Sequence, residues 1–235
     1  MTTNIILVRH AESLKNIKDI QGGSGEPLTS FGRKQIISLA NSFKALGVSN
    51  VNSVIISVPC VQTSETSNIL SRNTGIPIEK MHSFIPLNLG VIHGLSNAEI
   101  KTLYPQMYDR LIRWRHRQID ISELNIPGME NPNDFFDRGK EILSNITPNK
   151  YNIFVATNSL YILLLNILLG PNGCFGDGGY KCYNVPNCGV VWFEQLGESR
   201  YFIKPENTGI LNDADLPNFC SSGDVNFSIH RLCFA

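Results

Sequence analysis

The chain has 235 residues, of which 42% are hydrophobic and 17% are charged, so it can bury a sizeable core. Lys plus Arg equals Asp plus Glu at 20 each, which excludes the strongly basic surface typical of proteins that bind nucleic acid or acidic membranes. The sequence begins without a basic n-region, and its longest apolar stretch, residues 160–169, is too short to span a bilayer. We therefore expect one cytoplasmic domain over residues 1–235 that binds neither nucleic acid nor membrane.

The first third of the chain alternates short apolar runs with helical patterns. A continuous apolar run is typical of a strand buried on both faces, and apolar positions three and four residues apart are typical of a helix. In chain order we predict a strand over residues 5–8, a glycine-rich loop over 21–27, a helix capped by Thr29, a strand over 54–56, a helix through residues 69 and 70, and an edge strand over 76–80. The helix after Thr29 has its apolar positions at Ile36, Leu39, Ala40, Phe43 and Leu46.

The remainder of the chain continues this alternation. Residues 99–117 have a helical pattern with an arginine-rich end, and Pro127-Gly128 interrupts the chain after it. Further on we predict a helix over about 133–143, a strand over 153–156, an apolar helix over 160–169 that Gly170-Pro171 ends, strands over 189–194 and 201–204, and a tail after about residue 207. Strand-helix alternation predicts an α/β fold, a three-layer sandwich in which helices cover both faces of a mostly parallel sheet.

Arg9 and His10 directly follow the first predicted strand. Open α/β sheets bind ligands in the crevice beyond the carboxyl ends of their strands, so this pair lies where a ligand would bind. A guanidinium group matches the oxygens of a phosphate, and a neutral imidazole nitrogen can attack phosphorus. We therefore expect a phosphorylated small molecule or a phosphate anion as the ligand. No Cys or His pair has the spacing of a metal site, and we expect neither metal nor cofactor.

The sequence around this pair resembles the phosphate-pocket motif of the histidine phosphatase (phosphoglycerate mutase-like) superfamily. The resemblance starts with residues 7–13 and Asn16, continues through Gln21-Gly22, and extends over about residues 4–204. It implies a phosphoglycerate mutase-like fold in which His10 is the nucleophile and Arg9 binds the phosphate beside it. It also implies that Asn16 and the loop at Gln21 and Gly22 contact the substrate.

The chain departs from this family at three later positions of the pocket. Gln62 stands where the family has arginine, and Asn158 stands where it has a second histidine. Pro86 stands where the family has the glutamate that protonates the leaving group. The first two replacements remove positive charge from the predicted phosphate site, although we still expect the neutral side chains of Gln62 and Asn158 to contact the ligand. The third replacement removes a general acid.

Two features of the chain are candidates to compensate for these losses. Arg113 and Arg115 lie in the segment of about residues 95–130 where the family places a lid over the substrate, although a solvated helix face is the alternative explanation. His93 is a candidate replacement acid, and its alternative is a surface or hydrogen-bonded role.

The sequence thus predicts a family member that binds a phosphate ester at Arg9 and His10 but is catalytically impaired, a pseudophosphatase or a very weak phosphatase. The first alternative is an active phosphomonoesterase that forms a phosphohistidine at His10, with a mutase less favoured. The second alternative is a non-catalytic scaffold or interaction protein. Protein partners, the substrate and the oligomeric state stay open.

Overall fold

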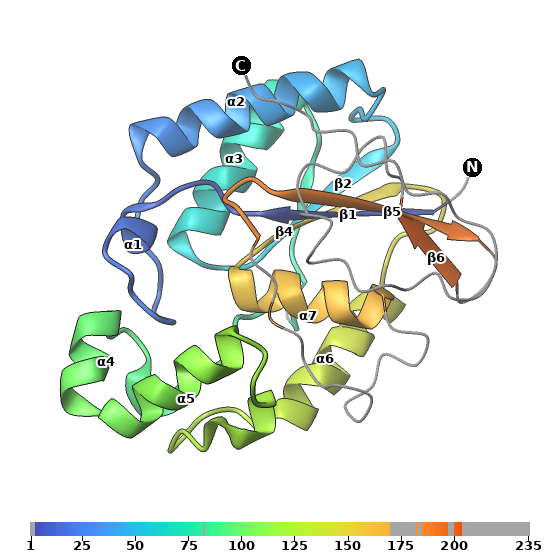
Figure 1. Cartoon of the computed structure of the whole chain (residues 1–235). Helices are drawn as coiled ribbons and strands as arrows, with labels where there is room; N and C mark the ends of the chain where they lie inside the picture. The colour runs from blue at the N-terminus through green and yellow to red at the C-terminus, as the bar shows by residue number, and fades with distance from the viewer. Residues whose placement is uncertain (1–2, 82, 170–181, 183–184, 197–199, 204–235) are drawn as a thin grey trace.

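The structure, a computed structural model, describes residues 3–81, 83–169, 182, 185–196 and 200–203 (Figure 1). The described residues contain a six-stranded sheet in the order β3-β2-β4-β1-β5-β6. The strands are β1 (Asn4–Arg9), β2 (Ser53–Ser57), β3 (Ile78–Glu79), β4 (Tyr151–Ala156), β5 (Val190–Leu196) and β6 (Arg200–Ile203). Strands β1 to β4 pair in parallel, whereas β5 runs antiparallel to β1 and β6 antiparallel to β5. The predicted α/β fold with a mostly parallel sheet is confirmed.

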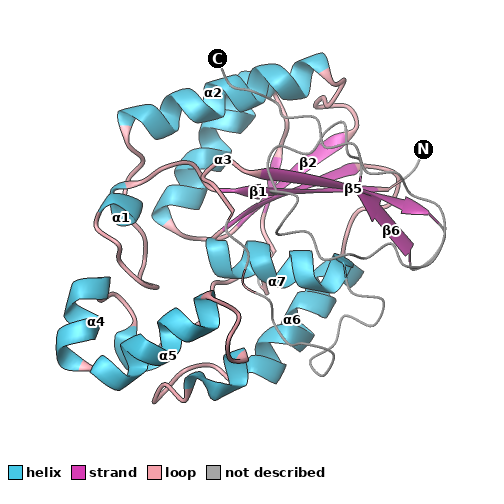
Figure 2. Ribbon diagram, in the orientation of Figure 1, coloured by secondary structure: helices cyan, strands magenta, loops and turns pink. Residues whose placement is uncertain are grey.

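Helices cover both faces of this sheet (Figure 2). The helices are α1 (Leu14–Ile17), α2 (Ser30–Ala45), α3 (Val61–Thr74), α4 (Asn97–Leu103), α5 (Pro105–Arg115), α6 (Pro132–Ser144) and α7 (Asn158–Leu169), with short 3-10 turns at η1 (Gly90–Ile92) and η2 (Ile121–Leu124). Helices α2 and α3 pack on one face, and α6 and α7 pack on the other. Helices α4 and α5 lie farther from the sheet, on the side of α1.

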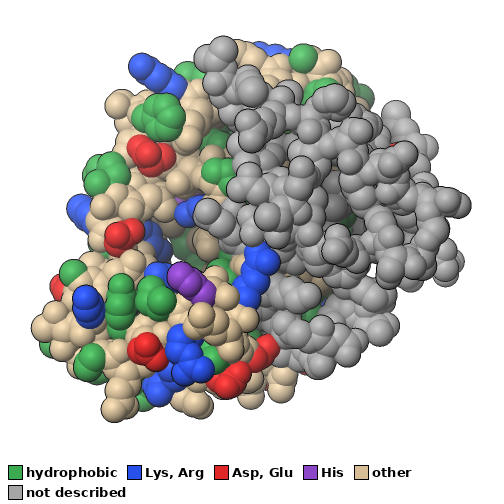
Figure 3. Space-filling view, in the orientation of Figure 1, with side chains coloured by type: hydrophobic (Ala, Val, Ile, Leu, Met, Phe, Trp, Pro, Cys, Tyr) green, Lys and Arg blue, Asp and Glu red, His purple; other side chains and the backbone are tan. Residues whose placement is uncertain are grey.

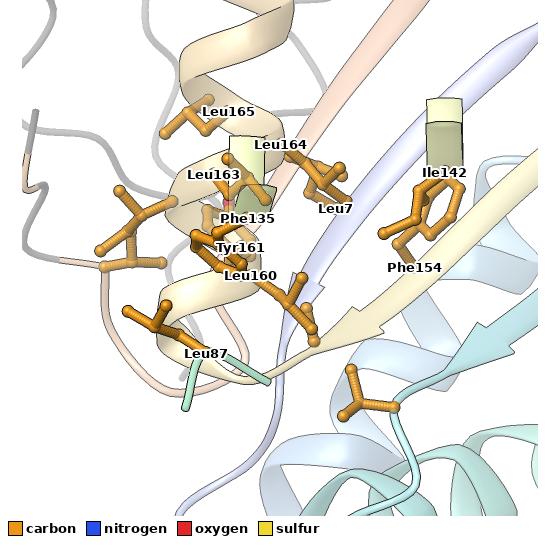
Figure 4. Packing of buried hydrophobic residues seen from close by; sticks show 14 of the residues in the cluster. Leu7, Leu87, Phe135, Ile142, Phe154, Leu160, Tyr161, Leu163, Leu164 and Leu165 are labelled. Carbon is orange, nitrogen blue, oxygen red and sulfur yellow. The ribbon is translucent and has the colours of Figure 1, made fainter. Parts of the chain in front are cut away.

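The alternation of side chains along β1 divides the core into two clusters. Ile6 and Val8 pack with the apolar face of α2, whereas Leu7 packs with α7 and Phe154 on the opposite side of the sheet. Figure 4 shows this second cluster, in which residues of α7 lie over the sheet. Since β1 is buried on both faces, its carboxyl end is held rigidly, and that end carries Arg9 and His10.

The structure corrects several boundaries. The helical pattern over residues 99–117 is two helices, because Pro105 cannot donate the hydrogen bond that continues a helix and Tyr104 before it leaves the helical region, with φ −137° and ψ 61°. Helix α2 ends at Ala45, so Leu46 caps the helix and is 39% exposed instead of being a core residue. Helix α7 begins two residues earlier than predicted, at Asn158.

Other predictions lie at the limits of what the structure describes. The edge strand is confined to β3, shorter than the predicted residues 76–80. Gly170-Pro171, residue 204 and the tail after residue 207 lie outside the described residues. Within the described part of the chain, no helix has the length and the apolar character needed to cross a membrane.

Candidate functional site

Three parallel strands bring the predicted pocket residues to one edge of the sheet. Strand β1 ends at Arg9, which pairs in register with Ala156 at the end of β4, and β2 ends beside them at Ser57. Because the carboxyl ends of parallel strands share an edge, the residues that follow them gather there. His10 follows β1, Gln62 lies in the first turn of α3 after β2, and Asn158 opens α7 after β4.

The imidazole of His10 is held in one orientation and one tautomer. Its Nδ1 lies 2.8 Å from the carbonyl oxygen of Ala11, and because a carbonyl can only accept, Nδ1 carries the hydrogen. The lone pair is therefore on Nε2, which makes Nε2 the ring nitrogen that can act as a nucleophile. The backbone is fixed as well, since the N–H of His10 donates to Ala156 O at 3.1 Å and its carbonyl accepts from Asn187 Nδ2 at 3.0 Å.

The side chain of His10 is neutral at pH 7. It is 3% exposed, and this burial, together with the positive charges of Arg9 and then Lys15, lowers its pKa from 6.5 to about 3. The hydrogen bond to Ala11 O acts in the opposite direction but is outweighed. Only an unprotonated imidazole has a lone pair to offer, so this environment keeps His10 in its nucleophilic form.

Arg9 provides a charged group next to His10. Its Nη1 donates to the carbonyl oxygen of Val185, which fixes one arm of the guanidinium group. Burial lowers its pKa to about 10, so the group still carries its charge at pH 7. Its Nε is buried and has no hydrogen-bond partner among the described residues. One donor of Arg9 is thus unsatisfied within the described part of the chain.

Asn16 is oriented by hydrogen bonds to its oxygen. Oδ1 accepts from the backbone N–H of Ser13 at 3.0 Å and from Asn187 Nδ2 at 3.2 Å. The amide nitrogen of Asn16 is therefore the group that it can present to an anion. Asn187 also holds His10 O, so one side chain links two parts of the predicted pocket.

The loop at Gln21 and Gly22 is tied to Arg115 of the predicted lid segment and to His93 and Gly94 just before it. Gln21 Oε1 accepts from Arg115 Nη2 at 2.8 Å, and Gln21 O accepts from the backbone N–H of Gly94 at 2.6 Å. His93 Nε2 accepts from the backbone N–H of Gly23 at 2.9 Å. Gly22 has φ +59°, and a Cβ there would lie 2.5 Å from His93 Nδ1, so the imidazole packs directly on this glycine.

These contacts place the two predicted lid arginines differently. The guanidinium group of Arg115 donates a hydrogen bond to Gln21, whereas Arg113 is exposed on α5. On the face that Figure 3 shows, Lys, Arg and His side chains lie around a hollow between the upper and lower parts of the molecule.

The residues at the three departures, Gln62, Asn158 and Pro86, have neither a charged side chain nor a group that can act as a general acid. Gln62 is 1% exposed, and its Oε1 is buried with no hydrogen-bond partner in the described part of the chain. The same is true of Asn158 Oδ1 at the start of α7. Gln62 also fills the space above Gly25, where a Cβ would lie 1.8 Å from Gln62 Oε1. Pro86 is half-buried in the segment between β3 and η1.

Sequence reasoning missed Lys15, a half-buried residue of α1. Its positive charge contributes to the low pKa of His10, and burial lowers the pKa of Lys15 itself. The signal was present, because Lys15 lies inside the motif, one residue before Asn16. Among the described residues, no group of three or more His, Cys, Asp or Glu side chains is placed to hold a metal ion.

Several known proteins are similar to this chain. Two relatives, each named probable phosphoglycerate mutase GpmB, come from Yersinia enterocolitica and Yersinia pestis and are 29% and 31% identical over 120 residues, which is 51% of this chain and 51% of each relative. The match thus covers about half the length of these relatives.

Solved structures and a family model extend the comparison. A mycobacterial hydrolase has a TM-score of 0.68 at 19% identity, covering 87% of this chain and 97% of its own. A mycobacterial glucosyl-3-phosphoglycerate phosphatase in complex with VO3 has a TM-score of 0.66 at 20% identity, covering 86% and 96%. Both share the fold of this chain. The family model described as histidine phosphatase superfamily (branch 1) matches residues 5–205, and the chain therefore belongs to that superfamily.

Proposed function

We propose that this protein binds a phosphate monoester or inorganic phosphate at Arg9 and His10 and that its catalysis is impaired. The observation that carries this proposal is the pairing of a neutral, oriented His10 with a charged Arg9 that has an unused buried donor. Asn16 adds an amide nitrogen, oriented through Ser13 and through Asn187, which also donates to His10 O. The glucosyl-3-phosphoglycerate phosphatase that shares this fold has been solved with VO3 and with inorganic phosphate, which supports an oxyanion as the ligand.

Impaired catalysis follows from the chemistry of the three departures. Removal of one preorganised donor to a developing charge costs about 10² to 10³ in rate, and removal of a general acid costs about 10² to 10⁴. These losses do not simply multiply, because groups that act as a unit are strongly non-additive. A combined deficit of about 10⁴ is therefore a conservative expectation. The protein acts as a pseudophosphatase or a very weak phosphatase.

The contacts of the lid segment argue against full compensation from that side. Arg115 is engaged by Gln21, and His93 accepts a hydrogen bond from the loop at Gly23. An active phosphomonoesterase would need these residues to turn toward the phosphate and to replace both a charge and an acid. We also propose that residues 1–235 form one cytoplasmic domain with a lid over about residues 95–130, as expected from the sequence.

The anion-binding site is tested by calorimetric titration with orthovanadate and with inorganic phosphate. Arg9→Ala is expected to weaken binding by about 10-fold to 100-fold, because a hydrogen bond to a charged group contributes about 1.5 to 3 kcal/mol. Arg113→Ala is the matched control, since it removes an exposed arginine and is expected to leave the affinity within about twofold. Equal losses in both variants would place the anion at the lid, and binding unaffected by Arg9→Ala would refute the proposed pocket.

A further inference from the structure

Lys15 lies beside the proposed phosphate pocket on an element that folds against it. It is the second residue of α1, next to Asn16, and its side chain is half-buried. Helix α1 is fastened by the N–H of Leu14, which donates to Pro27 O at 3.0 Å. The position of Lys15 is thus set by backbone contacts of its own helix.

The ammonium group of Lys15 has neither an ion-pair partner nor a hydrogen-bond partner among the described residues. Lys18, three residues farther along, lies in the opposite situation, since it is exposed and pairs with Glu26 at 3.2 Å. A cation that is partly removed from water without a counter-charge costs free energy. An unpaired ammonium group in this position therefore destabilises the folded state unless an anion binds to it.

The charged neighbours of Lys15 make this cost larger. Arg9 is a second cation close enough to oppose its charge, and His10 is affected by both cations. Cys60, at the N-cap of α3, is another titratable neighbour, and its thiol is neutral because burial raises its pKa. Arg9 and Lys15 are two positive groups that both act on His10, and together they form a field that favours a dianion.

Unpaired polar atoms at the same edge of the sheet are an independent observation. Arg9 Nε, Gln62 Oε1 and Asn158 Oδ1 are all buried without partners in the described part of the chain. Buried polar groups are normally satisfied by protein, water or ligand. Rotation of either amide by 180° about its last bond would present an NH2 group in place of the oxygen. The edge of the sheet is therefore polar but incompletely satisfied.

We propose that the ammonium of Lys15 is a phosphate-binding group that replaces, from α1, the positive charge missing at Gln62 and Asn158. The ligand is a phosphate monoester dianion held between Lys15 and Arg9, whose two charges match it, while neutral His10 lies beside the phosphorus. This inference rests on the proposed function, because it assigns a further ligand to the same pocket.

The test is calorimetric titration with inorganic phosphate at pH 8, where most of the phosphate is dianionic. Lys15→Met is expected to weaken binding by about 10-fold to 100-fold, and Lys15→Arg to stay within a few-fold of the wild type because the charge remains. Lys34→Met is the matched control, because Lys34 is exposed on α2 and this variant removes the same charge from a residue outside the proposed pocket. Wild-type affinity in Lys15→Met, with binding lost in Arg9→Ala, would overturn the role of Lys15 and leave the pocket intact. Absence of phosphate binding in the wild type would overturn both.

A second measurement observes the side chain of Lys15 directly in the wild-type protein. Lysines of the wild-type protein are reductively methylated with ¹³C-formaldehyde, and the dimethyl-lysine signals are assigned with the Lys15→Arg and Lys34→Met variants. We expect the Lys15 signal to move on addition of inorganic phosphate and the Lys34 signal to stay in place. A Lys15 signal unchanged at saturating phosphate would overturn the proposal.

Discussion

Acid should destabilise this protein through His10. In the folded state the pKa of His10 is about 3, mainly because the ring is buried and secondly because Arg9 repels an added proton. In the unfolded chain a histidine titrates near 6.5. Below that pH the unfolded state binds a proton at this residue, whereas the folded state does not. The contribution of His10 to stability is therefore complete above pH 6.5 and is lost as the pH falls toward 3. Well below pH 6.5 each pH unit costs about 1.4 kcal/mol, but at pH 6.5 itself the slope is only half as steep, so the loss between pH 6.5 and 4.5 is about 2.3 kcal/mol.

Urea unfolding at a series of pH values measures this loss, with His10→Asn as the matched variant. Asparagine does not titrate, and its amide nitrogen lies near the position of Nδ1, so it can keep the bond to Ala11 O. The other titrating groups largely cancel in the difference between the two proteins. We expect the free energy of unfolding of the wild type to fall relative to His10→Asn by roughly 2 to 3 kcal/mol between pH 7 and 4.5. A difference independent of pH, with an NMR titration of His10 near 6.5, would refute the reasoning.

Three further substitution experiments follow from the structure. Gly32→Ala is expected to lower the free energy of unfolding by about 1 to 3 kcal/mol in urea melts, because the new Cβ would lie 2.1 Å from Glu12 O. This clash outweighs the better helix propensity of alanine. Unchanged stability would show that the backbone at Glu12 can move away. Gln62→Arg with Asn158→His is expected to tighten phosphate binding by about 1.5 to 3 kcal/mol for each charged hydrogen bond formed, as calorimetry would show. Adding Pro86→Glu is expected to raise turnover of p-nitrophenyl phosphate above that of the double variant, and a folded triple variant without gain in affinity or rate would mean that the backbone at these positions has diverged.

Local patterns in the sequence were sufficient for the framework of the fold. The apolar run before Arg9 predicted β1 because a strand buried on both faces has no polar alternation. Thr29 was expected to cap α2, and its side chain accepts from the N–H of Gly32 at 2.9 Å. The family resemblance supplied the predicted pocket residues, and the parallel ends of β1, β2 and β4 place four of them at one edge.

Contacts between residues far apart in the chain could not be predicted from local sequence patterns. Asn187 is 177 residues from His10 in the chain, yet its amide donates to His10 O. The packing of His93 on Gly22 depends equally on how two distant loops meet. The burial of Lys15 cannot be predicted from α1 alone, since a four-residue helix shows no clear hydrophobic face. The proposed charge compensation by Lys15 depends on such tertiary contacts, which local sequence patterns do not determine.

Hydrolysis of p-nitrophenyl phosphate by the wild-type protein, measured in parallel with a family phosphatase that retains the arginine, glutamate and second histidine, decides between weak and ordinary catalysis. We predict a kcat/KM at least about 10⁴-fold below that of the intact enzyme, with any residual rate removed in His10→Ala. An ordinary rate that His10→Ala abolishes would contradict impaired catalysis and would show that other residues replace the missing charge and acid.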